Sequence, residues 1–206
     1  MPVSDKYNRI LDAFQKLLES QNIQKISVSD IAQAAGIAKG SIYYYFPSKD
    51  AIVEALVERS YAASIETAKQ LAKQENIPPF TRMALIFQAC RNSSSEFLKQ
   101  NKATTNSSVQ EQTLLHHKYL RYIITELKPV LAEIIRQGIE GGEISFEHPD
   151  SLAEIVLLVL TVKIDNTLIP STKEEIEQII LDLIVLLEKG TDNPKGSLNF
   201  LTLPIA

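Results

Sequence analysis

Apolar residues recur at helical spacing from the start of the chain. Over residues 4–20 the recurrence has steps of three and four, which predicts an amphipathic helix. Its apolar stripe comprises Tyr7, Ile10, Leu11, Phe14, Leu17 and Leu18. A second helical pattern runs without a break from Ser48 to about residue 75 and stops before Pro78 and Pro79. We expect its inward stripe to contain Ile52, Ala55, Leu56 and Ala63.

The middle of the chain predicts two further helices separated by a polar segment. The first covers residues 79–99, with an inward face of Met83, Ile86, Phe87, Cys90 and Phe97. The polar segment 101–112 reads as a loop or a short frayed helix. The second helix covers 114–138, where Pro129 should kink or divide it, and Gly141 and Gly142 provide the stop.

Two predicted helices, 150–168 and 172–189, are apolar on nearly every side. A helix that is apolar all round has to be buried all round, and a chain of 206 residues does not easily bury two such terminal helices. A second copy can, so these helices predict a homodimer held by a four-helix bundle; a monomeric core helix pair is the alternative. The tail, 190–206, has Leu-rich patches without a period and predicts no element.

Residues 27–50 predict two short helices, a tight turn and the start of a third helix. Ser27 or Ser29 can cap the first helix, and Gly36 supplies a bend that needs positive φ. Phe46 before Pro47 ends the second helix, and Ser48 caps the next. This layout is that of a helix-turn-helix, whose second helix enters the major groove of DNA.

The second helix of this motif has an unusual outward face. A helical wheel turns Gly40, Ser41, Tyr43 and Tyr44 outward, with Lys39 at the boundary. The same wheel places Ala38, Ile42, Tyr45 and Phe46 inward. Lys39 and Lys49 each lie in the first turn of a helix, where the helix dipole disfavours a cation unless an anion such as a phosphate docks there. The alternative is that the aromatic side chains simply belong to the core.

The same stretch resembles the tetracycline-repressor (TetR/AcrR) family of bacterial transcriptional regulators. The family pattern T-V-x-x-I-A-x-x-A-G-V-S-x-G-x-x-Y-x-Y-F-x-x-K-x-x-L is matched without gaps, with Ser27, Ala38 and Ile52 as mild departures. The resemblance implies DNA contacts from residues 39–41 and 43–45 and a phosphate contact from Lys49, and it covers only about the first 60 residues. The full predicted DNA-binding set is Ser27, Ser29, Lys39, Gly40, Ser41, Tyr43, Tyr44, Tyr45 and Lys49.

Charge and composition qualify this prediction. The net charge is −4, divided into +1 over the first 50 residues and −5 over the rest, so a few placed cations rather than a broad basic patch would contact phosphate. Cys90, the only cysteine, suits a reducing cytoplasm and reads as a buried small side chain, with a redox sensor as the alternative. No signal peptide or membrane span is expected. His116 and His117 point apart on a helix, so no metal site or cofactor is expected.

The predicted fold is all-α, with an N-terminal three-helix helix-turn-helix DNA-binding domain at 1–50 and a helical ligand-binding and dimerisation domain at 51–189. We predict a dimeric one-component regulator, a repressor rather than an activator, that binds a near-palindromic double-stranded operator and is released by a small-molecule effector. A DNA-binding protein without a ligand, controlled by a protein partner, is the alternative; an all-α enzyme lacks a converging set of catalytic groups. The predicted effector contacts are Phe87, Cys90, Arg91, His116, Tyr119, Tyr122, Ile123 and Lys163.

Overall fold

The computed structural model describes residues 5–100, 109–166 and 169–202, with side-chain surroundings given outside 95–100, 109–116 and 164–165. Every regular element in these ranges is helical, which confirms the all-α prediction. The chain divides into two compact units. The N-terminal unit comprises Met1–Ala62 with Ser93–Tyr119, and the C-terminal unit comprises Ala63–Asn92 with Leu120–Ala206. These units describe packing, so the domain limits at residues 50 and 189 stay predictions.

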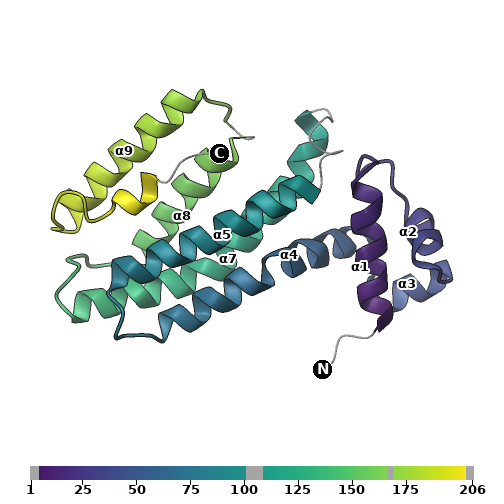
Figure 1. Ribbon diagram of the computed structural model, residues 1–206, viewed down its shortest axis with the longest axis horizontal. Coiled ribbons are helices and arrows are strands. Elements are labelled where there is room, and N and C mark those ends of the chain that lie inside the picture. Colours follow the sequence, from purple (N-terminus) through teal and green to yellow (C-terminus); the bar gives the residue numbers. More distant parts are fainter. Residues whose placement is uncertain (1–4, 101–108, 167–168, 203–206) are drawn as a thin grey trace. The chain divides into compact units, whose positions relative to one another are not determined.

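Three short helices form the start of the N-terminal unit (Figure 1): α1 (Asp5–Leu18), α2 (Val28–Ala35) and α3 (Lys39–Tyr45). Helix α1 packs on α2, and α2 packs on α3. The buried stripe of α1 includes Ile10, Leu11 and Phe14, as the spacing predicts. Tyr7 stays half-buried, with its ring 4.7 Å from that of Phe46.

The caps of α2 explain where this helix begins and ends. Ser27 and Asp30 form a reciprocal capping box: the Ser27 hydroxyl accepts a bond from the Asp30 amide, and the Asp30 carboxylate accepts one from the Ser27 amide. Of the two predicted caps, Ser27 is therefore the one used. At the other end Gly36 adopts φ +64°, which confirms the bend predicted for this glycine.

Helix α4 (Lys49–Ala72) runs through the boundary between the units without a break. The Ser48 hydroxyl accepts a bond from the Ala51 amide and caps α4, as predicted. Ile52, Ala55 and Leu56 are buried, but Ala63 is exposed. The prediction for Ala63 is wrong, and the buried positions at this level of the helix are Ser64 and Ile65.

The helices α5 (Pro79–Gln100) and α7 (Val109–Glu140) follow, each shared between the two units. Met83, Ile86 and Cys90 of α5 are buried and Phe87 is half-buried, whereas the Phe97 side chain lies outside the described set. Helix α7 begins earlier than predicted and continues through Pro129. Of the two expected effects of this proline, the division of the helix is therefore wrong and the kink stays a prediction. Buried side chains flank the proline on both sides and hold the helix in place: Leu127, Val130 and Leu131.

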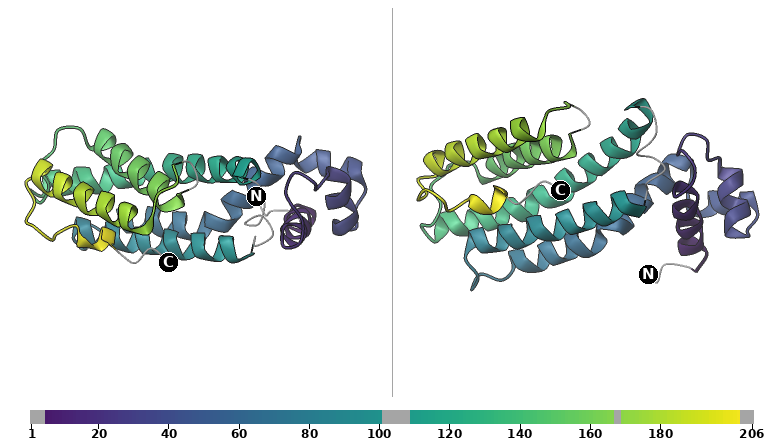
Figure 2. Two further views of the ribbon diagram at one scale, coloured as in Figure 1. Left: turned by 90° about the horizontal axis from the view of Figure 1, so that it is seen from above. Right: turned by 45° about the horizontal axis from the view of Figure 1, so that its top comes forward.

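Helices α8 (Pro149–Asp165) and α9 (Lys173–Gly190) lie side by side in the C-terminal unit (Figure 2). Asn166 ends α8 in the left-handed conformation, and a Thr172–Glu175 capping box begins α9. The tail then forms a 3-10 helix, η1 (Asn199–Thr202), against α9. Its side chains Leu198 and Leu201 join the core around α9, an arrangement that the sequence does not predict.

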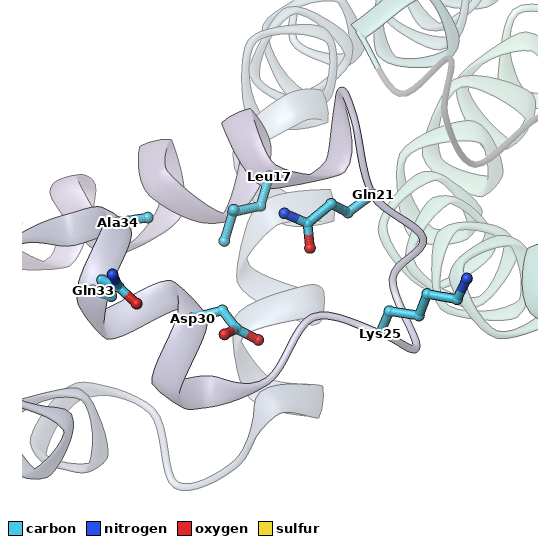
Figure 3. A pocket seen from close by; sticks show the side chains of 6 residues that line it. All are labelled: Leu17, Gln21, Lys25, Asp30, Gln33 and Ala34. Atoms are coloured by element: carbon cyan, nitrogen blue, oxygen red, sulfur yellow. The ribbon is translucent and has the colours of Figure 1, made fainter.

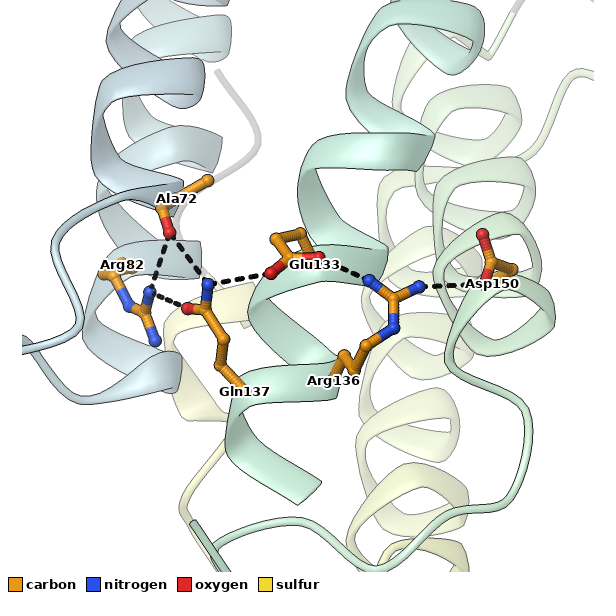
Figure 4. Close-up of polar contacts among 6 residues, drawn as sticks. All are labelled: Ala72, Arg82, Glu133, Arg136, Gln137 and Asp150. Atoms are coloured by element: carbon orange, nitrogen blue, oxygen red, sulfur yellow. Dashed lines mark hydrogen bonds and ion pairs between the residues drawn. The ribbon is translucent and has the colours of Figure 1, made fainter. Parts of the chain in front are cut away.

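A polar network joins the ends of several helices in the C-terminal unit (Figure 4). The buried Arg82 guanidinium donates to the Gln137 side-chain oxygen at 2.5 Å and to the Ala72 carbonyl at 3.3 Å. Gln137 also donates to Glu133, at 3.0 Å, and Glu133 accepts from Arg136. The network gives the last turn of α4 a cationic partner at its carbonyl end.

Candidate functional site

The second helix of the helix-turn-helix carries two large aromatic side chains that face solvent. The exposed fraction is 85% for Tyr44 and 49% for Tyr43, which agrees with the outward face of the helical wheel. Tyr45 is half-buried and meets Tyr44 edge-on, with 5.1 Å between ring centroids. Exposed tyrosines on one face of a short helix provide both hydrogen-bonding hydroxyls and flat apolar surface.

The backbone beside these tyrosines is open. A β-carbon placed on Gly40 would meet no heavy atom within 4 Å. Lys39 and Ala38 are exposed and Ser41 is half-buried. The inward placement of Ala38 is therefore wrong, because this residue lies in the turn and precedes the first turn of α3 as an N-cap without a side-chain bond.

Lys49 has a partner within its own unit. Its ammonium group donates to the Ile23 carbonyl, in the connection between α1 and α2. Burial lowers the pKa of Lys49, and the nearby carboxylates of Asp50 and Asp30 oppose that shift. The phosphate role stays a prediction, and the structure adds a second role, since Lys49 ties the start of α4 to the α1–α2 connection.

An open hollow of about 540 Å³ lies between the end of α1 and α2 (Figure 3). The residues that line it include Gln21, Lys25 and Gln33, none of which is in the predicted set. The Ser27 hydroxyl and amide bind the Asp30 carboxylate here and lower its pKa. The sequence signal for Lys25 is its place two residues before the cap of α2, close to the exposed Ser27 and Ser29.

The predicted effector contacts are distributed over both units. Tyr119 belongs to the N-terminal unit, where its hydroxyl lies 3.0 Å from that of Ser94 and its ring lies 4.9 Å from Tyr61. His116 also falls in that part of the chain, but its side chain lies outside the described set. The remaining members belong to the C-terminal unit: Phe87, Cys90, Arg91, Tyr122, Ile123 and Lys163.

Within the C-terminal unit these residues differ in their surroundings. Ile123 is buried, Tyr122 is half-buried, and Lys163 donates to the Ser171 hydroxyl at 3.2 Å. Burial lowers the pKa of Arg91. Phe87 lines a small apolar cavity of about 50 Å³ among α5, α7, α8, α9 and the tail. The predicted effector contacts stay a prediction, and Phe87 is the one among them that lines this cavity.

Cys90 is a buried thiol. Burial raises its pKa to about 11, partly opposed by a hydrogen bond with Ser64. A protonated, buried thiol reacts slowly with oxidants, so the redox-sensor alternative gains no support. Among the described residues, no three His, Cys, Asp or Glu side chains form a group that could hold a metal ion. No helix in the described ranges is long and apolar enough to cross a membrane.

Helices α2 and α3, joined by the turn at Gly36, place this all-α chain in the class of helix-turn-helix proteins. The family models "Bacterial regulatory proteins, tetR family" and "Tetracyclin repressor-like, C-terminal domain" match residues 10–56 and 93–184. The chain belongs to the tetR family, whose members are transcriptional regulators rather than enzymes, and this confirms the family predicted from the motif.

Curated relatives match parts of the chain. The HTH-type transcriptional regulator YvdT of Bacillus subtilis is 36% identical over 66 residues, which cover 32% of this chain and 34% of YvdT. The nucleoid occlusion factor SlmA of Haemophilus ducreyi is 28% identical over 104 residues, 50% of this chain and 49% of SlmA. The chain thus spans between about a third and a half of these relatives.

A solved structure shows the same fold over most of the chain. SmeT, the repressor of the multidrug efflux pump SmeDEF of Stenotrophomonas maltophilia, aligns with a TM-score of 0.64 at 14% identity. The alignment covers 95% of this chain and 93% of SmeT.

Proposed function

We propose that the protein is a homodimeric transcriptional repressor that binds a near-palindromic DNA operator and leaves it when a small molecule binds the C-terminal unit. The observation that carries the DNA-binding part is the exposed face of α3. Tyr43 and Tyr44 face solvent beside Gly40, whose open backbone allows a close approach. In the major groove such a face contacts base edges and phosphates.

The dimer is supported by the apolar surface of α8 and α9. Large apolar side chains on these two adjacent helices are exposed: Ile155, Leu158, Leu181, Val185 and Leu186. Leu186 has 68% of its surface exposed, and a second copy of the chain would cover it in a four-helix bundle. A dimer with two-fold symmetry then reads half-sites about 34–36 Å apart, or a related spacing.

Operator binding is tested with Tyr44→Ala. Genomic fragments retained by the purified protein are labelled, and their affinity is measured by fluorescence anisotropy at physiological salt. Tyr44→Ala should weaken binding at least about tenfold, equal to about 1.4 kcal/mol, since each dimer loses two contacts. Its melting temperature should hardly change because Tyr44 is exposed.

Two controls accompany this measurement. Tyr44→Phe keeps the ring and removes the hydroxyl, so it separates ring packing from hydrogen bonding. If Tyr44→Ala binds the fragments as tightly as the natural chain, α3 is not the helix that contacts the DNA bases. If the natural chain retains no fragment selectively, the repressor proposal fails.

The dimer is tested with Leu186→Lys, which places a charge at the most exposed side chain of this apolar set. Light scattering after size exclusion should report a monomer, and operator affinity should fall. Glu177→Lys is the matched control, since Glu177 is exposed on the same helix and outside the apolar set. A Leu186→Lys variant that remains dimeric would rule out this interface.

A regulator without a small-molecule effector is the second candidate. The small volume of the described apolar cavity and the partial likeness to the nucleoid occlusion factor SlmA favour it. Operator binding that no small molecule changes, but that a protein partner does, would decide for this candidate.

A further inference from the structure

The apolar cavity of the C-terminal unit is closed by the tail of the chain. Four helices supply its walls, including Phe80 and Phe87 of α5, Leu131 of α7 and Ala153 of α8. Leu198, Phe200 and Leu201 of the tail complete the lining, and the Phe200 ring centroid lies 6.3 Å from that of Phe87. The side chains of the tail therefore occupy an apolar groove that is larger than the remaining 50 Å³.

The tail is attached to α9 by few polar contacts. The Glu188 carboxylate accepts bonds from the Gly196 amide, at 2.7 Å, and from the Leu198 amide, at 3.2 Å. The other backbone bonds described for residues 197–201 stay within the tail, as from Leu201 to Leu198. The walls, in contrast, are continuous helices. The Asn193 amide also donates to the Glu188 carbonyl, at 2.8 Å, so the start of the tail is fixed to α9. For residues 196–201 the Glu188 carboxylate is the polar latch, and side-chain packing holds the rest.

Two features of the tail favour its release. The Ser197 hydroxyl is buried with no hydrogen-bond partner among the described residues, which disfavours the docked state. Gly196 lies directly before the segment that enters the groove and adopts φ +93°, a backbone conformation that favours glycine. Because glycine has the greatest backbone freedom, this position regains conformational entropy when the segment detaches. Detachment would hydrate the Ser197 hydroxyl and break no regular α-helix.

We propose that residues 198–201 act as an internal plug and that an uncharged apolar molecule binds the groove by displacing them. The lining carries no charged side chain, and its one polar side chain, Thr191, already donates to the Leu187 carbonyl. A charged ligand would be buried there without a partner, so the groove selects uncharged molecules. A volume of 50 Å³ holds roughly one or two waters, so an organic ligand enters only when the plug leaves.

This inference rests on the proposed function for its purpose, since it names the chemical class of the effector. The binding event itself can be measured without DNA. The sequence contains no tryptophan, so Phe200→Trp creates a single fluorophore in the plug. Its emission reports whether residue 200 lies in the groove or in water.

The experiment titrates the full-length Phe200→Trp chain with 1-decanol. We expect a saturable shift of tryptophan emission to longer wavelength as the plug leaves. Adding Glu188→Gln, which replaces the charged acceptor by a neutral one, should lower the half-saturating concentration several-fold. Decanoate at the same concentrations should give no shift. Far-UV circular dichroism of the same samples is the control for general unfolding, and the helical signal should stay constant.

A second measurement uses the natural chain, so a folding defect of Phe200→Trp does not decide the outcome. N-phenyl-1-naphthylamine, an uncharged dye, should gain fluorescence with the protein, and decanol should displace it. Dye binding without a shift of the tryptophan emission of Phe200→Trp, equal shifts from decanol and decanoate, or no effect of Glu188→Gln would each overturn the plug. Because DNA is absent, failure here leaves operator binding standing, and failure of operator binding leaves this titration readable.

Discussion

Replacing Gly40 by alanine should raise stability and lower DNA affinity at the same time. Gly40 is the second residue of α3, and an added β-carbon meets no heavy atom within 4 Å. Alanine restricts the unfolded chain and favours the helix, which stabilises by up to about 1 kcal/mol. For a chain of this size that corresponds to a rise in melting temperature of about 2–4 °C.

The same methyl group projects from the face that carries Tyr43 and Tyr44. If DNA approaches the backbone at Gly40, the methyl group takes the space of a phosphate or base edge and separates the partners. We expect affinity for the selected fragment to fall at least about tenfold, which is about 1.4 kcal/mol. Anisotropy titration and thermal unfolding on one protein sample measure both quantities.

Gly36→Ala is the matched control, because its effect on stability has the opposite sign. Gly36 has φ +64°, and its added β-carbon would lie 3.4 Å from an Arg9 guanidinium nitrogen. The left-handed conformation costs alanine about 1–2 kcal/mol, so the melting temperature should fall. If Gly40→Ala raises stability but leaves DNA affinity unchanged, the face of α3 that carries Tyr43 and Tyr44 is not the DNA-binding face. If Gly40→Ala lowers stability instead, the space around this glycine is not open.

Two further predictions concern Lys49 and Cys90. Lys49→Met removes the bond to the Ile23 carbonyl and should lower the free energy of unfolding in urea by about 1–2 kcal/mol. Lys49→Arg should lower it less. If Lys49→Met is as stable as the natural chain, this bond does not stabilise the fold. Because the Cys90 pKa rises from 9.0 to about 11 on folding, the folded chain binds more protons between these values and loses stability as pH rises through them. Cys90→Ala should lack this part of the pH slope in urea titrations across the same interval, and an unchanged slope would contradict it.

Local signals explain why much of the fold could be predicted. Ser27, Gly36 and Ser48 act through bonds and backbone angles within a few residues, so their roles follow from short sequence patterns. The aromatic pair Tyr43 and Tyr44 was also predictable, because a wheel needs only the helical period. Small residues were not: Ala38 and Ala63 have too little apolar surface for a period to fix which way they face.

Long-range contacts explain the rest. Lys49 meets the Ile23 carbonyl across 26 positions of sequence, and nothing near Lys49 signals that partner. The tail has no apolar period, and its place depends on Glu188, whose carboxylate binds backbone amides that any residue type except proline provides. Pro129 predicts a kinked or divided helix locally, but the helix continues through it, and the packing of its buried neighbours favours this continuity.

The bond between Arg82 and Gln137 has a consequence for how this chain can diverge. Losing the Gln137 side-chain oxygen leaves a buried guanidinium with fewer acceptors, and losing Arg82 leaves the Ala72 carbonyl with Gln137 as its side-chain donor. A chain that has lost only one of these two side chains is therefore less stable than a chain that has both. Among close homologues, positions 82 and 137 should therefore change together or not at all, whereas the exposed residues around them vary independently.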